Sequence, residues 1–258
     1  MSKPEVVPDK ISNPINFYVI IGILVVGAGI FVAFQFLPEE ETGMLAFILS
    51  VGFASGAAAF AFFVAKRAGL GVISKAYLSL ALGFTAYVIA ELLYYTFDLV
   101  LGIEPYPSVA DIFFFALYPF TLGHLLLNMS YFHTGYTIFQ KIWIPAIPVF
   151  AIFIYIIMSL SVPDAELNFD FYYGLIFVAA AATTFSFTVM GTLTFKSGAL
   201  GVVWLLLLIG LMVNAAGDVW YYHLEIFGQY YDAHPVTVVW YVANMFIIYA
   251  LFKHIKII

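Results

Sequence analysis

The chain has 258 residues, of which 64% are hydrophobic and 9% charged, and its mean hydropathy is +1.05. Soluble globular domains do not have such a composition, so the sequence indicates an integral membrane protein. The formal net charge of -6 provides no basic surface for phosphate backbones, which excludes nucleic acid as a partner, and the absence of cysteine excludes disulfides and thiolate metal sites.

Eight long apolar runs follow a short polar tail, residues 1–13. A helix needs about 20 apolar residues to cross a bilayer core, where no water satisfies an exposed backbone. The first run is too long for a signal-peptide core, and no small-residue cleavage pattern follows it, so we expect it to be retained. The expected helices are 17–37, 44–65, 73–101, 110–132, 142–160, 171–195, 200–227 and 236–252.

The basic residues predict how these helices are oriented, because lysine and arginine near helix ends are held on the cytoplasmic side. With eight helices all nine basic residues fall on one side, whereas a seven-helix count would break this segregation. They are Lys3, Lys10, Lys66, Arg67, Lys75, Lys141, Lys196, Lys253 and Lys256. We therefore expect both termini to be cytoplasmic and the protein to lie in the cell membrane.

The sequence also resembles itself at an offset of 127 positions. The matching pairs are Tyr77 with Trp204, Leu80 with Leu207, Gly83 with Gly210, Glu91 with Asp218, Tyr94 and Tyr95 with Tyr221 and Tyr222, and Asp98 with Glu225. Four is an even number of helices, so the second half enters the membrane in the same sense as the first. The expected fold is all-α, with two parallel four-helix repeats, 14–136 and 137–258, in one membrane domain.

The repeated segments place polar side chains on one face of the third and the seventh helix, since positions three, four and seven apart share a face. On the third helix this face holds Tyr87, Glu91, Tyr94 or Tyr95, and Asp98. On the seventh helix it holds Asn214, Asp218, Tyr221 or Tyr222, and Glu225. We expect at most one tyrosine of each adjacent pair to face inward.

Glu91 and Asp218 are expected roughly 15 Å below the outer surface, given the rise of an α-helix. Facing lipid at such depth costs an ionisable side chain about 3 kcal/mol, so both should face the interior, across an outward-open cleft between the two helices. No lysine or arginine lies at this level. The acids are then protonated, hydrogen-bonded, or neutralised by a bound cation. The alternative to a binding site is that their hydrogen bonds only hold the two helices together.

Other polar residues carry weaker signals. Asp111 follows Ser108 at a helix start, where it either caps that helix or lines an outward-facing pocket. His124 reads as a lone buried histidine, with no second histidine at its depth to hold a haem. One group of residues near the outer surface has two interpretations, a metal site or solvated loop residues, because its spacing matches no established metal motif. That group is His223, Glu225, Asp232 and His234.

The segment at 90–127, AELLYYTFDLVLGIEPYPSVADIFFFALYPFTLGHLLL, resembles the poorly characterised multi-helix membrane regions found ahead of bacterial cyclic-di-GMP cyclase, phosphodiesterase and histidine kinase domains. The matching positions are Glu91, Tyr94, Asp98, Gly102, Pro107, Ser108, Ala110 and Asp111. The seventh and eighth helices match more faintly, with Thr237 or Val238 in place of Asp111. The resemblance implies a membrane-embedded sensory or ligand-binding module. No output domain follows the eighth helix in this sequence, so signalling would require a partner or a further C-terminal region.

No serine-histidine-acid order, metalloprotease pattern or phosphate loop occurs, so we expect no catalytic residue, no enzyme activity and no resident cofactor beyond a bound cation. The expected function is ligand or cation sensing in contact with membrane lipid. A proton- or cation-coupled transporter, which would use the same acids as carriers, and an accessory subunit of a larger membrane complex are the alternatives. Homo-oligomerisation stays open.

Overall fold

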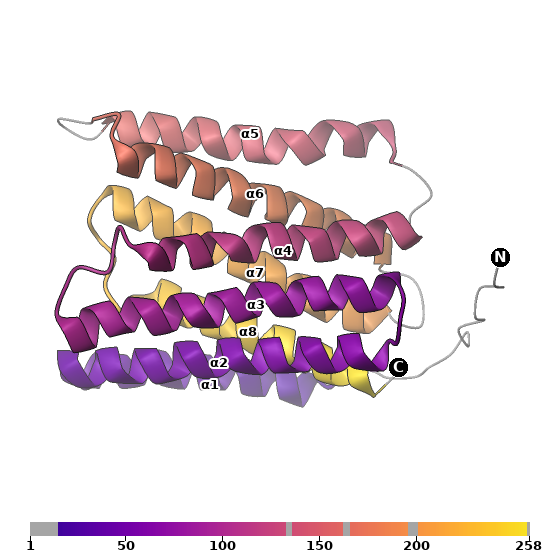
Figure 1. The fold of residues 1–258 in the computed structure, drawn as a ribbon, viewed down its shortest axis with the longest axis horizontal. Coiled ribbons are helices and arrows are strands. Elements are labelled where there is room, and N and C mark those ends of the chain that lie inside the picture. The colour runs from indigo at the N-terminus through magenta and orange to yellow at the C-terminus, as the bar shows by residue number, and fades with distance from the viewer. Residues whose placement is uncertain (1–14, 133–135, 162–165, 196–200, 257–258) are drawn as a thin grey trace.

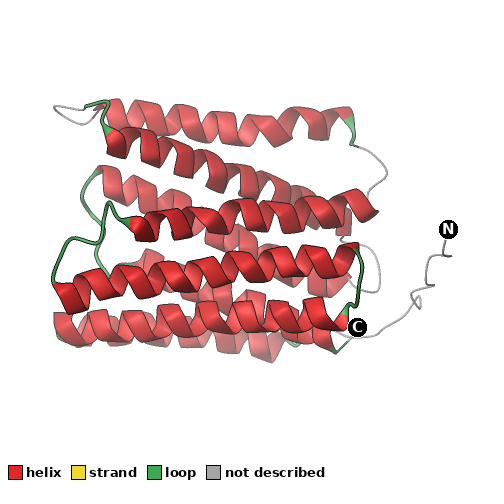
Figure 2. Ribbon diagram, viewed as in Figure 1, coloured by secondary structure: helices red, strands yellow, loops and turns green. Residues whose placement is uncertain are grey.

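The computed structural model describes residues 15–132, 136–161, 166–195 and 201–256, and every regular element in these ranges is helical (Figure 1, Figure 2). The elements are α1 (Phe17–Phe36), α2 (Glu39–Arg67), α3 (Val72–Tyr95), η1 (Thr96–Leu101), α4 (Val109–Phe132), α5 (Ile138–Ser161), α6 (Phe169–Phe195), α7 (Gly201–Ile226) and α8 (Pro235–Ile255). Eight spans in these ranges are long and apolar enough to cross a membrane. The prediction of an all-helical, multi-pass membrane protein is therefore confirmed.

Three helix boundaries differ from the expected ones by four residues or more. α2 begins at Glu39, directly after Pro38, because acidic residues suit the positive N-terminal end of a helix. α5 begins at Ile138, ahead of the expected position 142. The third helix is α-helical only to Tyr95 and then continues as the π-helix η1, whose turns hold more residues than α-helical turns. Residues in η1 are therefore rotated away from the face that α-helical spacing predicts.

Six of the helices contact one another in a closed ring. In order around the ring they are α2, α3, α4, α6, α7 and α8, and α8 contacts α2 again. The other two helices lie outside it: α1 packs against α8, and α5 packs mainly against α6 (Figure 1). In the described ranges α3 and α7 do not contact each other extensively, and the space between them, where the cleft is predicted, is bounded by the other four helices of the ring as well.

The helices alternate in direction, so α1 begins at the end of the bundle where α8 ends (Figure 2). The basic residues in the described ranges lie at or next to this end, which we call the basic end. They are Lys66, Arg67, Lys75, Lys141, Lys253 and Lys256. The opposite, acidic end carries the loops 102–108 and 227–234, and its acids include Glu41, Glu104, Asp170 and Asp232.

Two glycines at equivalent positions allow neighbouring helices of the ring to approach closely. A Cβ atom at Gly83 would lie 3.0 Å from the Cβ of Phe120 in α4. A Cβ atom at Gly210 would lie 3.0 Å from the backbone oxygen of Ala243 and 3.1 Å from the backbone nitrogen of Ile247, both in α8. Small residues at such contacts let membrane helices pack backbone to backbone. The pairs α3–α4 and α7–α8 are therefore fixed by close packing just below the enclosed space.

Candidate functional site

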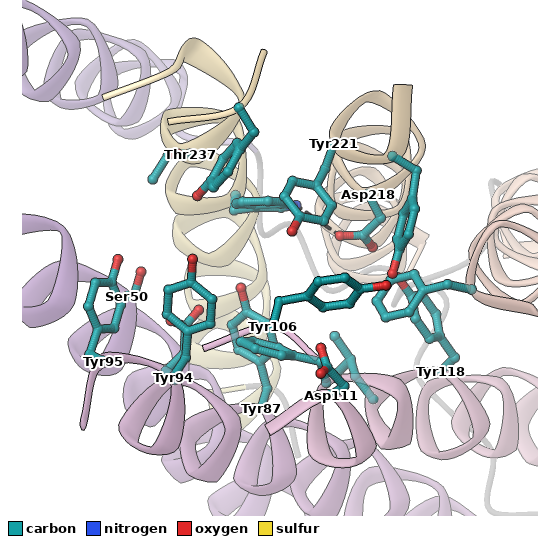
Figure 3. A pocket seen from close by; sticks show the side chains of 17 residues that line it. Ser50, Tyr87, Tyr94, Tyr95, Tyr106, Asp111, Tyr118, Asp218, Tyr221 and Thr237 are labelled. Atoms are coloured by element: carbon teal, nitrogen blue, oxygen red, sulfur yellow. Dashed lines mark hydrogen bonds between the residues drawn. The ribbon is translucent and has the colours of Figure 1, made fainter. Parts of the chain in front are cut away.

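A pocket with a cavity volume of about 90 Å³ lies inside the ring, toward its acidic end (Figure 3). All six ring helices and both loops of the acidic end contribute side chains to it. Ser50 comes from α2, Phe177 from α6, and Tyr106 and Tyr230 from the two loops. This volume has room for several water molecules or a ligand of a few heavy atoms.

The lining of the pocket is aromatic and acidic. Three carboxyl groups face it, those of Glu91, Asp111 and Asp218, together with the indole of Trp240. Eight tyrosines also line it: Tyr87, Tyr94, Tyr95, Tyr106, Tyr118, Tyr221, Tyr222 and Tyr230. Among the described residues that line the pocket there is no lysine, arginine or histidine. The pocket therefore gathers carboxyl groups, hydroxyl groups and aromatic rings without a basic side chain among the described residues.

Asp218 is held in a fixed orientation by two donors. Its side chain is only 8% exposed. The amide nitrogen of Asn214, one turn earlier, donates to Oδ2 at 3.0 Å, and the indole nitrogen of Trp240 in α8 donates to Oδ1 at 2.9 Å. Figure 3 shows the Asp218 carboxyl group among the other side chains of the pocket. A carboxylate has about four lone-pair sites, so these two bonds leave acceptor capacity for a ligand. Asn214 thus supports the acid, although it does not line the pocket itself.

Glu91 is the corresponding acid on α3 and is 6% exposed. Its carboxyl group interacts with the hydroxyl of Tyr87, one turn earlier on the same helix. The prediction that these acids face the interior of one polar space agrees with the structure, which places Glu91 and Asp218 in the lining of the same pocket. They reach it from helices that are not neighbours in the ring, so the pocket separates the two helices.

Asp111 combines the two roles that the sequence left as alternatives. The backbone nitrogen of Ser108 donates to its Oδ2 at 2.6 Å, while the Ser108 hydroxyl accepts from the backbone nitrogen of Ala110 at 3.1 Å. This reciprocal arrangement is a capping box at the start of α4. The same carboxyl group also lines the pocket. Capping therefore fixes the position of the third acid.

The expectation for the adjacent tyrosines is wrong, because all four of them line the pocket. The rings of Tyr94 and Tyr95 meet edge to face with centroids 5.4 Å apart, and those of Tyr221 and Tyr222 do so at 5.3 Å. Adjacent residues on a helix point about 100° apart, and a pocket enclosed by six helices is wide enough to receive both side chains of a pair.

Two other predicted site residues lie outside the pocket lining. Asp98 falls in η1, where the π-helical turn moves it off the face that carries Glu91. Glu225 shares the face of Asp218 by spacing, but it lies in the last turn of α7 and is exposed. The acid pairs of the repeated segments therefore contribute one pocket carboxyl from each helix.

The four outer residues suggested for a metal do not form a metal site in the structure. No group of three histidine or acidic side chains in the described ranges could hold a metal ion. His234 instead caps α8, because its Nδ1 accepts from the backbone nitrogen of Val236 at 3.2 Å. The His223 ring contacts Phe227. His223 and His234 therefore have separate environments.

The two loop tyrosines cover the pocket at the acidic end. The hydroxyl of Tyr106 donates to Oδ1 of Asp170 in α6 at 3.1 Å, so this loop is tied across the ring. Burial, reinforced by Asp170, raises the pKa of Tyr106 above its ordinary value, and burial beside Asp232 does the same for the pKa of Tyr230. Both hydroxyls therefore keep their protons and remain able to donate to an anionic group.

Sequence reasoning missed six members of the lining whose side chains carry a hydroxyl or N–H group. They are Ser50, Tyr106, Tyr118, Tyr230, Thr237 and Trp240. One of them carried a usable signal, because Tyr118 is seven positions after Asp111 and so shares its helix face. Trp240 carried none, since its bond to Asp218 depends on how α8 packs against α7.

The histidine predicted to be alone has a second histidine near it, so that expectation is corrected. His124 donates through Nδ1 to the backbone oxygen of Ala76 at 3.0 Å, and its ring stacks on Trp204. Tyr77 contacts His124 on its ring and shares a 2.6 Å hydrogen bond with Nδ1 of His254. This group forms a second buried polar centre, separate from the pocket and nearer the basic end.

Comparison with known proteins found no family model, curated protein or solved structure that matches this chain.

Proposed function

We propose that this protein is a membrane receptor without catalytic activity that binds a cationic ligand in the pocket and senses it. The observation that carries the proposal is the pocket's lining of three carboxyl groups without a basic side chain among the described residues. Burying a carboxylate without a compensating charge is costly, and a bound cation supplies that compensation. The aromatic rings add further attraction for positive charge.

The orientation of the chain is part of this proposal. The described basic residues gather at the end where α1 begins and α8 ends, which the positive-inside tendency assigns to the cytoplasm. The pocket lies toward the other end, so its ligand would come from outside the cell. The resemblance of residues 90–127 to sensory membrane regions favours the same function.

We also propose that the bundle consists of two parallel repeats. The contacts within the ring repeat after four helices. The contacts α2–α3, α3–α4 and α8–α2 correspond to α6–α7, α7–α8 and α4–α6. Gly102 and Gly228 both end a helix with positive φ, at 61° and 60°. They are 126 positions apart, one fewer than the offset of 127 between the repeated segments. The first half therefore has one added residue before its glycine, and the π-helical segment η1 accommodates it.

Cation-coupled transport is the second candidate, and one observation favours it. A smaller cavity of about 10 Å³ lies next to the pocket and shares Leu117 and Tyr118 with it. Asn214 and the buried hydroxyl of Thr121 line this cavity, and that hydroxyl has no hydrogen-bond partner among the described residues. Such a cavity has room for about one water. It lies on the side of the pocket that faces the basic end.

Binding and flux measurements separate the two functions. The purified protein in lipid nanodiscs is titrated with inorganic and organic monovalent cations by calorimetry, and the same protein in sealed liposomes is tested for uptake of each. Saturable binding that is weakened in Glu91→Gln and Asp218→Asn, but not in Glu41→Gln, supports the pocket as the site. Glu41 is an exposed acid at the same end of the bundle. Uptake that depends on the two pocket acids would replace sensing by transport, and absence of any saturable binding would refute both.

A further inference from the structure

The three pocket acids are spread over three helices and do not converge as the ligands of a metal ion. Glu91, Asp111 and Asp218 come from three different helices, and no three acidic or histidine side chains in the described ranges converge as metal ligands would. Calcium and magnesium require six or more oxygen ligands at about 2.0 to 2.6 Å. The carboxyl groups are therefore suited to neutralise a cation from several sides without coordinating a metal ion.

The walls around Asp218 are aromatic. Trp240, which holds its carboxyl group, also lines the pocket, and the ring of Tyr221 lies 5.6 Å from that of Trp240 at an angle of 55°. Tyr118, another pocket residue, interacts with the same carboxyl group. A carboxylate bounded by ring faces in different planes is the arrangement by which proteins recognise organic ammonium groups.

The hydroxyl groups and the volume narrow the ligand further. Eight tyrosine hydroxyls in the lining can accept from an ammonium N–H or donate to a carboxylate. The cavity of about 90 Å³ limits the ligand to a few heavy atoms. Long polyamines and peptides exceed this volume.

We infer that the pocket binds a small organic ammonium ion, whose charged nitrogen pairs with the Asp218 carboxyl and whose alkyl groups lie against the rings of Tyr221 and Trp240. This inference rests on the proposed cation binding and names the class of cation. Glu91 supplies a second carboxyl group from the other side of the pocket. An inorganic ion would gain little from the ring faces, because it holds its hydration shell more strongly than an alkylammonium ion does.

The test compares two series of probes on the protein in nanodiscs, at constant ionic strength. The first series is methylammonium, ethylammonium and tetramethylammonium chloride, and the second is sodium, potassium, magnesium and calcium chloride. We expect saturable binding of the alkylammonium ions and no competition from the inorganic ions at equal concentration. Asp218→Asn is expected to weaken alkylammonium binding at least tenfold, because it removes the paired charge.

A second variant isolates the aromatic contribution. Tyr221→Leu leaves every pocket carboxyl in place and removes one ring, so it is expected to weaken alkylammonium binding about three- to thirtyfold. The variant Glu41→Gln, outside the pocket, is expected to bind as the unaltered protein does. Circular dichroism of each variant shows whether its helices are intact, and Tyr221→Leu decides the question if Asp218→Asn does not fold.

Each result has a distinct meaning. Saturable binding of inorganic ions alone, weakened by Asp218→Asn, would overturn the inference and leave the proposed cation site standing. Alkylammonium binding that neither pocket variant changes would also overturn it, since the ions would then bind elsewhere. If no probe of either series binds, the inference and the proposed function both fail.

Discussion

Gly217 in α7 determines where Trp240 lies, and Gly217→Ala therefore tests the geometry of the pocket directly. A Cβ atom at this position would lie 2.9 Å from Nε1 and 3.0 Å from Cδ1 of Trp240. That Nε1 donates to Oδ1 of Asp218 at 2.9 Å. The added methyl group must displace the indole, and the hydrogen bond is lost with it.

The size of the effect follows from two opposing contributions. A hydrogen bond to a charged group contributes about 1.5 to 3 kcal/mol to stability. Alanine in place of glycine within a helix raises the free energy of unfolding by about 1 kcal/mol. Gly52→Ala is the matched control, because a Cβ atom there would have no atom within 4 Å and the variant has only the second contribution. Gly217→Ala should therefore be less stable than Gly52→Ala by about 1.5 to 3 kcal/mol.

Unfolding in one detergent, followed by the helical circular dichroism signal, measures this difference. A double-mutant cycle identifies its cause. Trp240→Phe alone removes the indole N–H, so adding Gly217→Ala to it should cost much less than Gly217→Ala costs by itself. If Gly217→Ala is as stable as Gly52→Ala, or if the effects of the two substitutions add in full, the assigned role of Gly217 is refuted.

Three further predictions concern other contacts of the ring. Gly210→Ala should destabilise the protein by about 1 to 3 kcal/mol, because its methyl group meets backbone atoms of α8. Gly22→Ala is the control, because a Cβ atom there has no atom within 4 Å. Thermal unfolding compares the two variants, and equal stability would contradict the close packing. Tyr77→Phe should cost about 1 to 3 kcal/mol in the same assay, since it leaves the buried Nδ1 of His254 without its partner. Burial lowers the pKa of His234 from its ordinary value of 6.5, so the stabilisation that His234 gives α8 is present above pH 6.5 and is lost as the pH falls below that value. The protonated ring can no longer accept a hydrogen bond from the backbone nitrogen of Val236 through Nδ1. His234→Asn keeps an acceptor that does not titrate, and its unfolding curve should depend less on pH; an unchanged pH dependence would argue against this cap.

The number of helices and the two deep acids could be predicted from the sequence because both depend on local rules. Long apolar runs must be helical in a bilayer, and the confirmed count of eight follows from that constraint alone. Glu91 and Asp218 could be assigned to the interior because a central acid facing lipid is costly. The same rule did not extend to Asp98, because no residue pattern before it indicates the π-helical turn.

The partners of these acids could not be predicted, because they depend on the order of helices around the ring. Trp240 donates to Asp218 only because α8 packs directly on α7. His254 lies far along the chain from Tyr77, and no spacing rule joins them. The limit of one inward tyrosine per pair failed for a related reason, since it assumed a narrow seam between two helices.

The ring has a consequence for how compounds reach the pocket. Each ring helix contacts the next, so a hydrophobic compound dissolved in the bilayer meets packed helix surfaces on every side. At the acidic end, two short loops of the described ranges contribute to the pocket, one through Tyr106 and the other through Tyr230, and a solute arriving through water meets them first. Lipophilic analogues should therefore gain no advantage from partitioning into the membrane, and changes to those loops should alter the rate of association more than changes to the outer helices α1 and α5.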